Sequence, residues 1–214
     1  MSAIRLEVRP GRRWGSRNPF RVLVGALVSS RTRDRVTGEA TARLLAIAPV
    51  PSVLARLPTG RIARAVYPAG FYRTKARHLK ELAIILGEVH GGSVPRDGKS
   101  LRALPGVGPK VAALTMAEGH GIPAVCADIH VHRISNRLGL VRTRDPGQTQ
   151  VALEKILPRK PWSGWNRLLV PFGQARCGSR PRCAGCPARR SCATGIKWGR
   201  MARRGAAGRK EGKT

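Results

Sequence analysis

Residues 104–110 read Leu-Pro-Gly-Val-Gly-Pro-Lys, and this stretch predicts a tight turn between two helices. Gly106 and Gly108 make the turn, because glycine adopts positive φ angles and lets the backbone approach a ligand closely. Pro109 suits the first position of the second helix, where its missing N–H would have no partner. The start of that helix is partly positive and offers N–H groups, a combination that holds phosphate. Lys110 lies in its first turn, beside the expected anion.

The segments on either side of the turn carry apolar residues at helical spacing. Asn18-Pro19 predicts a helix start, and the strongly apolar helix that follows it belongs in a core. No segment alternates apolar and polar residues as a half-buried strand does. The sequence therefore predicts an all-α protein without internal repeats and with about ten helices, of which the clearest are 19–31, 34–47, 72–89, 109–118, 129–138, 147–157 and 161–176.

Charge is the strongest feature of the composition. The 214 residues contain 41 Lys and Arg against 11 Asp and Glu, a formal net charge of +30. That excess indicates a polyanionic partner, nucleic acid first. The start of the chain has no apolar signal-peptide core, and no stretch approaches the length of a membrane helix. We therefore expect no membrane association and a cytoplasmic, nucleoid-associated protein.

Four of the five cysteines fall within 16 residues and follow the spacing C-x5-C-x2-C-x5-C. Disulfides are not expected in an intracellular setting, whereas four thiolates in one loop bind a soft metal. Structural zinc sites usually come as two short pairs separated by a long spacer, so the three consecutive gaps favour a [4Fe–4S] cluster, with Zn as the alternative. The predicted ligands are Cys177, Cys183, Cys186 and Cys192. Cys126 lies in an apolar stretch and is expected to be a buried small hydrophobic residue.

Taken together, the glycine turn with Lys110, an aspartate 18 residues later and the cysteine loop resemble the endonuclease III family of DNA base-excision glycosylases. The resemblance spans 19–192. Its matching stretches are Leu104–Lys110, Ala127–Arg133 with Asn136 and Arg137, Phe172-Gly-Gln and the cysteine loop, and weaker ones are Leu27–Asp34 and Gly70–Ala76.

The family implies a two-domain helix-hairpin-helix glycosylase fold with DNA in the cleft between the domains. Residues 19–124 would form a six-helix barrel domain that contains the hairpin. Residues 125–194, together with 1–18, would form the iron–sulfur cluster domain. Residues 195–214 carry mostly basic and small residues and are predicted to be a disordered tail with a bias towards polyanions.

The resemblance also implies the chemistry, with Lys110 as nucleophile and Asp128 as its acidic partner. A neutral lysine amine can attack the sugar carbon and form a Schiff base, which permits strand cleavage by β-elimination. A carboxylate nearby stabilises the positive charge that develops on the sugar. From the residues alone, Lys110 could be only a phosphate contact and Asp128 only a helix N-cap.

Further residues are predicted to contact DNA. Arg31 and Phe71 match family positions that fill the gap left in the duplex when the target base leaves the stack. The hairpin and the arginine-rich cysteine loop offer phosphate contacts. The complete predicted set is Gly106, Val107, Gly108, Arg31, Phe71, His130, Arg182, Arg189 and Arg190.

The function expected from these features is base-excision repair by a monomeric enzyme. It would remove oxidised pyrimidines from double-stranded DNA and cut the strand at the abasic site through the lysine Schiff base. The alternatives are a glycosylase for thymine or uracil opposite guanine and a non-catalytic protein that binds damaged DNA.

Overall fold

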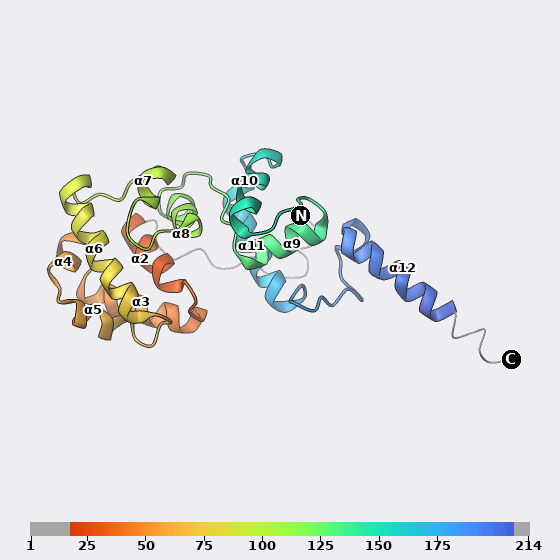
Figure 1. Ribbon diagram of the computed structural model, residues 1–214, viewed down its shortest axis with the longest axis horizontal. Coiled ribbons are helices and arrows are strands. Elements are labelled where there is room, and N and C mark those ends of the chain that lie inside the picture. The colour runs from red at the N-terminus through yellow and green to blue at the C-terminus, as the bar shows by residue number, and fades with distance from the viewer. Residues whose placement is uncertain (1–17, 208–214) are drawn as a thin grey trace. The chain divides into compact units, whose positions relative to one another are not determined.

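The computed structural model describes residues 18–207, with side chains up to residue 201, and within these ranges it contains helices and no strand (Figure 1). The described residues fall into two compact units. Residues 18–124 are called the hairpin unit here, and residues 125–207 the cysteine unit. Within the described ranges, no helix is both long enough and apolar enough to cross a membrane.

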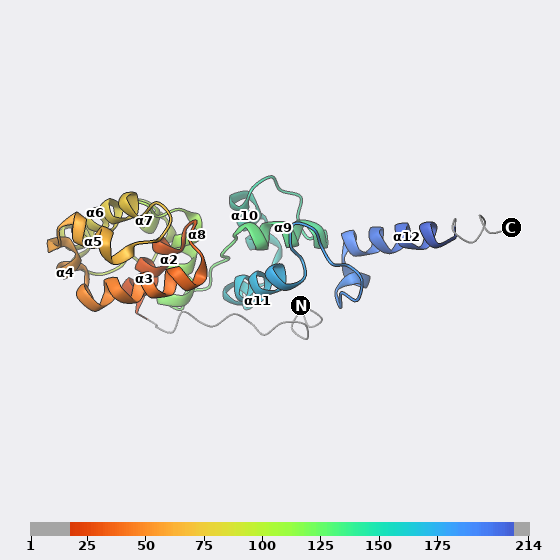
Figure 2. The same cartoon turned by 90° about the horizontal axis from the view of Figure 1, so that it is seen from below.

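The hairpin unit is built around a buried N-terminal helix. Asn18 caps this helix, since its side-chain oxygen accepts from the backbone N–H groups of Phe20 and Arg21. Residues 22–28 are all buried, which confirms the predicted place of this helix in a core. The longest helix, α6, packs on α4 and α5, and α2 packs on α3 and η1 (Figure 2). The elements are α2 (Pro19–Ser29), α3 (Asp34–Ile47), α4 (Pro51–Arg56), α5 (Thr59–Val66), α6 (Tyr72–His90), α7 (Gly98–Arg102), α8 (Pro109–Leu114) and η1 (Thr115–Gly119).

The helix expected over 109–118 differs from a regular α-helix. It is α-helical through Leu114 and then widens into the π-helical turn η1. The Thr115 hydroxyl donates to the carbonyl of Val111, and the Thr115 carbonyl accepts from the N–H of His120, five residues later. Such bonding within a helix widens its turn.

The cysteine unit has a core between three helices, in which α9 packs on α10 and α11. The core side chains include Val131, Ile134, Leu153, Leu169 and Phe172. A chain of polar contacts crosses from α9 to α10, where His132 Nδ1 lies 2.6 Å from Thr149 Oγ1. The elements are α9 (Ile129–Leu138), α10 (Pro146–Ile156), α11 (Trp162–Ala175), η2 (Arg189–Ser191) and α12 (Ala193–Ala207).

The prediction of a disordered tail from residue 195 is wrong for the described part, because α12 is helical through Ala207. Ala, Arg, Lys and Met are strong helix formers, so a run rich in them is helical despite its charge. Close packing also fixes the first turn, since a Cβ at Gly195 would lie 2.7 Å from the carbonyl oxygen of Arg189. Residues 208–214, and the predicted contribution of 1–17 to the second domain, lie outside the described residues.

Candidate nucleic-acid interface and metal centre

The glycine turn forms a hairpin between α7 and α8. The carbonyl of Leu104 accepts from the N–H of Val107 at 3.1 Å, which closes the turn. Gly106 has φ +75°, and Gly108 is the extended N-cap of α8. Lys110, the predicted nucleophile, is the second residue of α8 and is partly buried. Val107 has a buried side chain, so a contact between this residue and DNA would use its backbone.

The hairpin rests on helix α6. A Cβ at Gly106 would lie only 2.7 Å from Nδ1 of His78, which is a residue of α6. The positive φ and this close approach each disfavour a larger residue. At Gly108, by contrast, no atom lies within 4 Å of the position a Cβ would take. Gly106 therefore lets the hairpin pack closely against α6. At Gly108 no other residue covers the backbone of the hairpin.

The predicted acid, Asp128, is the N-cap of α9. Its Oδ1 accepts from the N–H groups of His130 and Val131, each at 2.9 Å, so the predicted capping role is confirmed. The carboxylate is thereby held at the positive end of α9. Capping and catalysis are compatible, because a cap fixes the orientation of the carboxylate that chemistry would use. Asp128 belongs to the cysteine unit and Lys110 to the hairpin unit.

His130 is packed between α9 and α11. A Cβ at Gly173 would lie 2.4 Å from His130 Nδ1, so the glycine makes room for the imidazole ring. The same Nδ1 lies 2.9 Å from Nη2 of Arg133, whose Nε donates to the carbonyl of Cys177 at 3.0 Å. A continuous path of polar contacts thus runs from His130, two residues after Asp128, through Arg133 to Cys177, the first predicted cysteine ligand.

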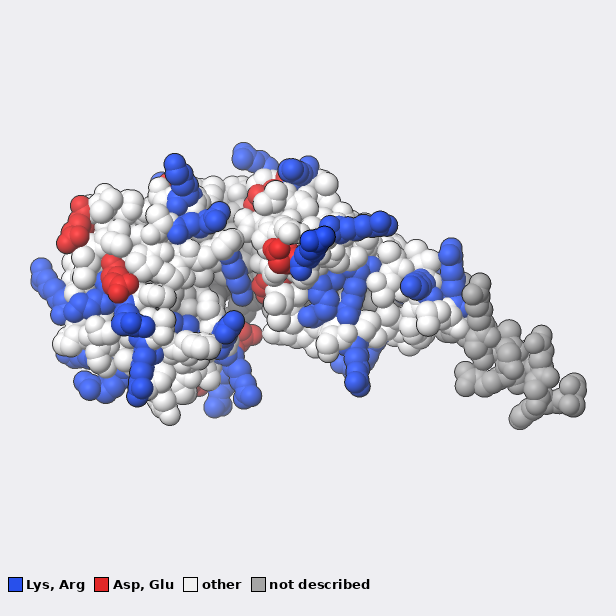
Figure 3. Space-filling model, viewed as in Figure 1, with Lys and Arg blue, Asp and Glu red and all other residues white. Residues whose placement is uncertain are grey.

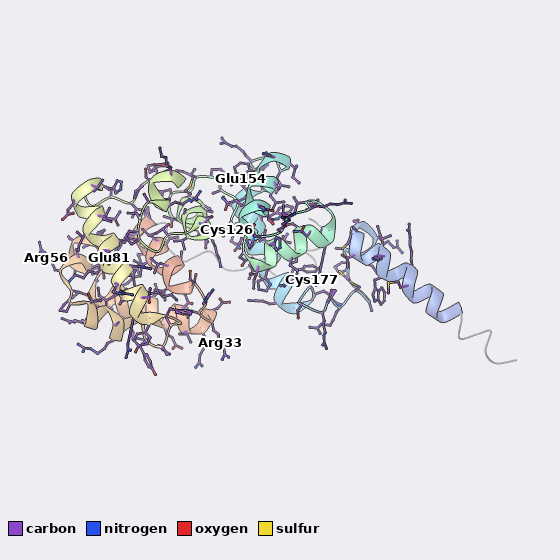
Figure 4. The ribbon with its side chains drawn as sticks, in the orientation of Figure 1. Arg33, Arg56, Glu81, Cys126, Glu154 and Cys177 are labelled. Atoms are coloured by element: carbon purple, nitrogen blue, oxygen red, sulfur yellow. The ribbon has the colours of Figure 1, made fainter. Side chains whose placement is uncertain are left out.

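The four predicted ligands surround one cavity of the cysteine unit, whose wall also includes the apolar Ile134, Phe172 and Ala188. Figure 4 shows Cys177 where the chain leaves α11, and Cys126 apart from it. Arg137 clamps the start of the loop, since its guanidinium donates to Cys177 Sγ at 3.4 Å and to the carbonyls of Gly178 and Ser179.

The donor set, four thiols around one cavity, fits a soft metal centre. Burial raises the pKa of Cys183, as do the neighbouring cysteines, and burial also raises the pKa of Cys186. Thiols in this environment become thiolates when a cationic centre replaces their protons.

The loop arginines have different environments. Arg182 is exposed and its Nη2 donates to the carbonyl of Ala175 at 2.6 Å. The guanidinium of Arg189 lies 5.8 Å from the ring centroid of Trp198, so this side chain also stabilises the attachment of α12. Arg190 is exposed. The DNA contacts of these three residues stay predictions.

Arg31 and Phe71, the predicted gap-filling residues, form a pair on the surface of the hairpin unit. The guanidinium carbon of Arg31 lies 5.3 Å from the centroid of the Phe71 ring, and Phe71 is 61% exposed. Among the described residues, these are the two non-glycine residues with positive φ, 51° and 57°. Such backbone conformations are unfavourable for residues with a Cβ and often mark functional sites.

Lys75 is not among the residues that the sequence predicts to be functional. This side chain is 5% exposed, and its Nζ donates to the carbonyls of Val28 and Ser30 and to Oγ1 of Thr32. Burial lowers its pKa to about 8. A signal was present, because Lys75 precedes Leu79 and Leu82 at spacings of four and seven and therefore lies on the apolar face of α6.

Basic side chains spread over both units, and acidic ones are few on the face seen in Figure 3. Arg35 and Glu39 form an ion pair on α3, and because the chain has 41 Lys and Arg against 11 Asp and Glu, most of its positive charge has no acidic partner within the chain. Such a surface suits a polyanionic ligand.

Comparison with known proteins identifies the family. The model of the HhH-GPD superfamily base excision DNA repair proteins matches residues 24–159. The chain is 40% identical to an endonuclease III of Thermotoga maritima over 176 residues, which cover 82% of this chain and 83% of that protein. It is 34% identical to an endonuclease III of Bacillus subtilis over 182 residues, 84% of this chain and 83% of that protein. It is also 41% identical to an endonuclease III-like protein 1 of Bos taurus, over 81% of this chain and 58% of the bovine protein.

Solved structures agree. A trapped covalent intermediate of an endonuclease III with DNA matches with a TM-score of 0.84 at 31% identity, over 94% of each chain. A thermostable thymine-DNA glycosylase matches with a TM-score of 0.78 over 92% of this chain and 93% of that one, and its 24% identity supports the fold alone. The predicted all-α helix-hairpin-helix glycosylase fold is confirmed.

Proposed function

Because this chain belongs to the HhH-GPD superfamily of base excision DNA repair proteins and, within it, to the endonuclease III family, we propose that it excises oxidised pyrimidines from duplex DNA and then cuts the strand at the abasic site. The observation that carries the proposal is the position of Lys110. It is held at the start of α8, directly after a hairpin whose backbone is open at Gly108.

The proposed reaction begins with the amine of Lys110 in its neutral form. Its nitrogen lone pair forms a bond to C1′ of the damaged nucleotide, and the base leaves with the electrons of the glycosidic bond and takes up a proton. Loss of the amine proton and opening of the sugar give a protonated Schiff base. That cation makes the C2′ proton acidic, and its removal expels the 3′ phosphate by β-elimination. Hydrolysis of the Schiff base releases the lysine.

Asp128 is suited to assist this reaction electrostatically. Departure of the base leaves positive charge on the sugar, and a fixed carboxylate stabilises that charge without having to reorganise. The two backbone N–H groups that bind Oδ1 supply the fixed orientation.

The cysteine loop would hold a [4Fe–4S] cluster through Cys177, Cys183, Cys186 and Cys192, with Zn as the alternative occupant. When bound, such a cluster links four separated thiolates covalently and can undergo one-electron redox chemistry. Arg137 would donate to one ligand sulfur and to the loop carbonyls and so fix the loop that carries the arginines.

Borohydride trapping tests the chemistry. With abasic-site duplex, we expect the wild-type chain to form a covalent adduct that Lys110→Ala does not form. Lys155→Ala is the matched control, since it removes the same charge from an exposed position on α10. A wild type without adduct, or an active Lys110→Ala lyase, would refute the catalytic role of Lys110 and leave a DNA-binding protein.

A substrate panel then tests the lesion class. We expect faster excision of thymine glycol and dihydrouracil than of uracil or thymine opposite guanine. The reverse order would identify the chain as a mismatch glycosylase.

A further inference from the structure

Among the described residues, Lys75 is the only charged side chain that is buried. Burying an ammonium is costly unless hydrogen bonds compensate for the lost water. Here each of its three donors has one acceptor, at distances of 2.7 Å to Val28 O, 2.5 Å to Ser30 O and 2.8 Å to Thr32 Oγ1. Because its pKa of about 8 lies above neutral pH, the group remains mostly protonated at pH 7 and can donate all three hydrogens.

The three acceptor atoms lie at the end of α2 and in the turn that follows it. The last carbonyls of a helix have no partner within the helix, and a cation is favoured at that end. Lys75 supplies both a donor and a positive charge there. Its acceptors are 43 to 47 residues away in sequence, so the contact joins the start of α6 to the end of α2.

A second contact joins the same two segments. Oγ1 of Thr32 also accepts from the backbone N–H of Gly70 at 3.1 Å. A Cβ at Gly70 would lie 2.3 Å from the carbonyl oxygen of Arg31, so the two backbones touch at a position that only glycine permits. The turn of residues 30–32 and the turn of residues 70–71 are therefore clasped together.

Each of these two turns carries one residue of the exposed Arg31–Phe71 pair. Arg31 lies between two acceptors of Lys75, Ser30 and Thr32, and Phe71 is the N-cap residue of α6, four positions before Lys75. Both have unfavourable left-handed backbone conformations, which persist only where the surroundings enforce them. The contacts of Lys75, Thr32 and Gly70 lie next to both residues in the chain.

We propose that Lys75 is a positioning residue, whose ammonium joins the end of α2 to the Gly70–Phe71 turn and so holds the Arg31–Phe71 pair ready to fill the space of an extruded base. The proposal rests on the proposed function, since only a protein that extrudes bases needs such a pair. Lys75 itself is buried, so it acts through Arg31 and Phe71 and not on the substrate.

Base extrusion and sugar chemistry can be measured separately in the full-length protein. Fluorescence of a 2-aminopurine next to a thymine glycol reports unstacking in the bound duplex, and borohydride trapping on a preformed abasic site needs no base to be extruded. The variants are Lys75→Met, which keeps the length of the side chain but removes its donors, and Thr32→Val, which removes the shared acceptor. Lys80→Met, at a partly exposed position on the same helix, is the control, and Phe71→Ala is the reference for loss of the pair.

We expect Lys75→Met and Thr32→Val to lower the fluorescence increase and the excision rate from duplex by about tenfold, as Phe71→Ala does, because unassisted unstacking is costly. Trapping on abasic duplex should stay within about threefold of wild type, since an already missing base is the easiest to extrude. Lys80→Met should match wild type in every assay.

Wild-type values of duplex excision for both variants would overturn the proposal. An equal fall of excision and trapping would also overturn it, because it would indicate a general loss of structure. Should Lys75→Met not fold, the same comparison rests on Thr32→Val. A wild type that raises the fluorescence but forms no adduct would refute the proposed chemistry, and the fluorescence of the variants would still test the positioning role.

Discussion

Replacement of Gly106 by alanine separates the two reasons for glycine in the hairpin. At φ +75°, a residue with a Cβ is disfavoured by about 1–2 kcal/mol. The added Cβ would also lie 2.7 Å from His78 Nδ1, and such overpacking costs about 1–3 kcal/mol. His78 is only partly buried and can rotate, so we expect a total loss of about 2–4 kcal/mol. For a chain of this size that corresponds to a fall in Tm of roughly 5–15 °C.

A double-mutant cycle, measured by thermal unfolding, separates the loss in stability that comes from the backbone from the loss that comes from the contact with His78. In a His78→Ala background, Gly106→Ala should lose the contact with the imidazole ring and keep that with the Cβ of residue 78, which lies 3.1 Å from the added Cβ, so the coupling energy should be about 1–2 kcal/mol. Gly38→Ala, at an exposed position in the middle of α3 with no atom near the new Cβ, should instead raise stability by about 0.5–1 kcal/mol. Equal losses from Gly106→Ala with and without His78 would refute the contact between the hairpin and α6.

Gly108→Ala completes the comparison. This position has a negative φ and open space, so stability should change by less than about 1 kcal/mol. If a DNA backbone approaches the hairpin here, affinity for abasic duplex should nevertheless fall by about tenfold or more, because the methyl group occupies the space of the ligand. Unchanged affinity would show that DNA does not approach the hairpin at this residue.

Three further perturbations test other parts of the structure. Asp128→Asn should preserve the cap of α9 but lower base excision about a hundredfold or more by removing the charge, whereas the same change at Asp145, the cap of α10, should leave excision unchanged. Because burial lowers the pKa of Lys75 from 10.5 to about 8, the unfolded chain holds a proton that the folded chain has lost between these pH values. The free energy of unfolding should therefore rise with pH in that window, by at most about 3 kcal/mol. The difference in Tm between wild type and Lys75→Met, measured across the window, should show this rise. A difference in Tm that does not change with pH would contradict the burial of the charge. If the cysteine loop holds a [4Fe–4S] cluster, as proposed, Arg137→Met should shorten the lifetime of that cluster in the presence of an iron chelator by about tenfold, measured by visible absorbance. An unchanged lifetime would show that the bond from Arg137 to the first cysteine sulfur does not stabilise the cluster.

Local sequence signals determined most of the helices and their ends. Asn18 and Asp128 cap the helices that their positions predict, because a cap depends only on residues two or three positions away. The turn at Gly106 is likewise predicted from residues that are close to it in sequence. The helix α12 also depends on local propensity, which the charge of the segment does not reveal.

Tertiary structure alone decided what holds the surface pair. Lys75 looks like one more lysine in a basic chain, and only folding brings it to acceptors more than 40 residues away. The same is true of Gly106 against His78 and of Gly70 against Arg31. Caps and turns are set by interactions over a few residues, which a sequence displays directly. Burial and close approach depend on which distant segments pack together. A short stretch of sequence does not show which segments these are.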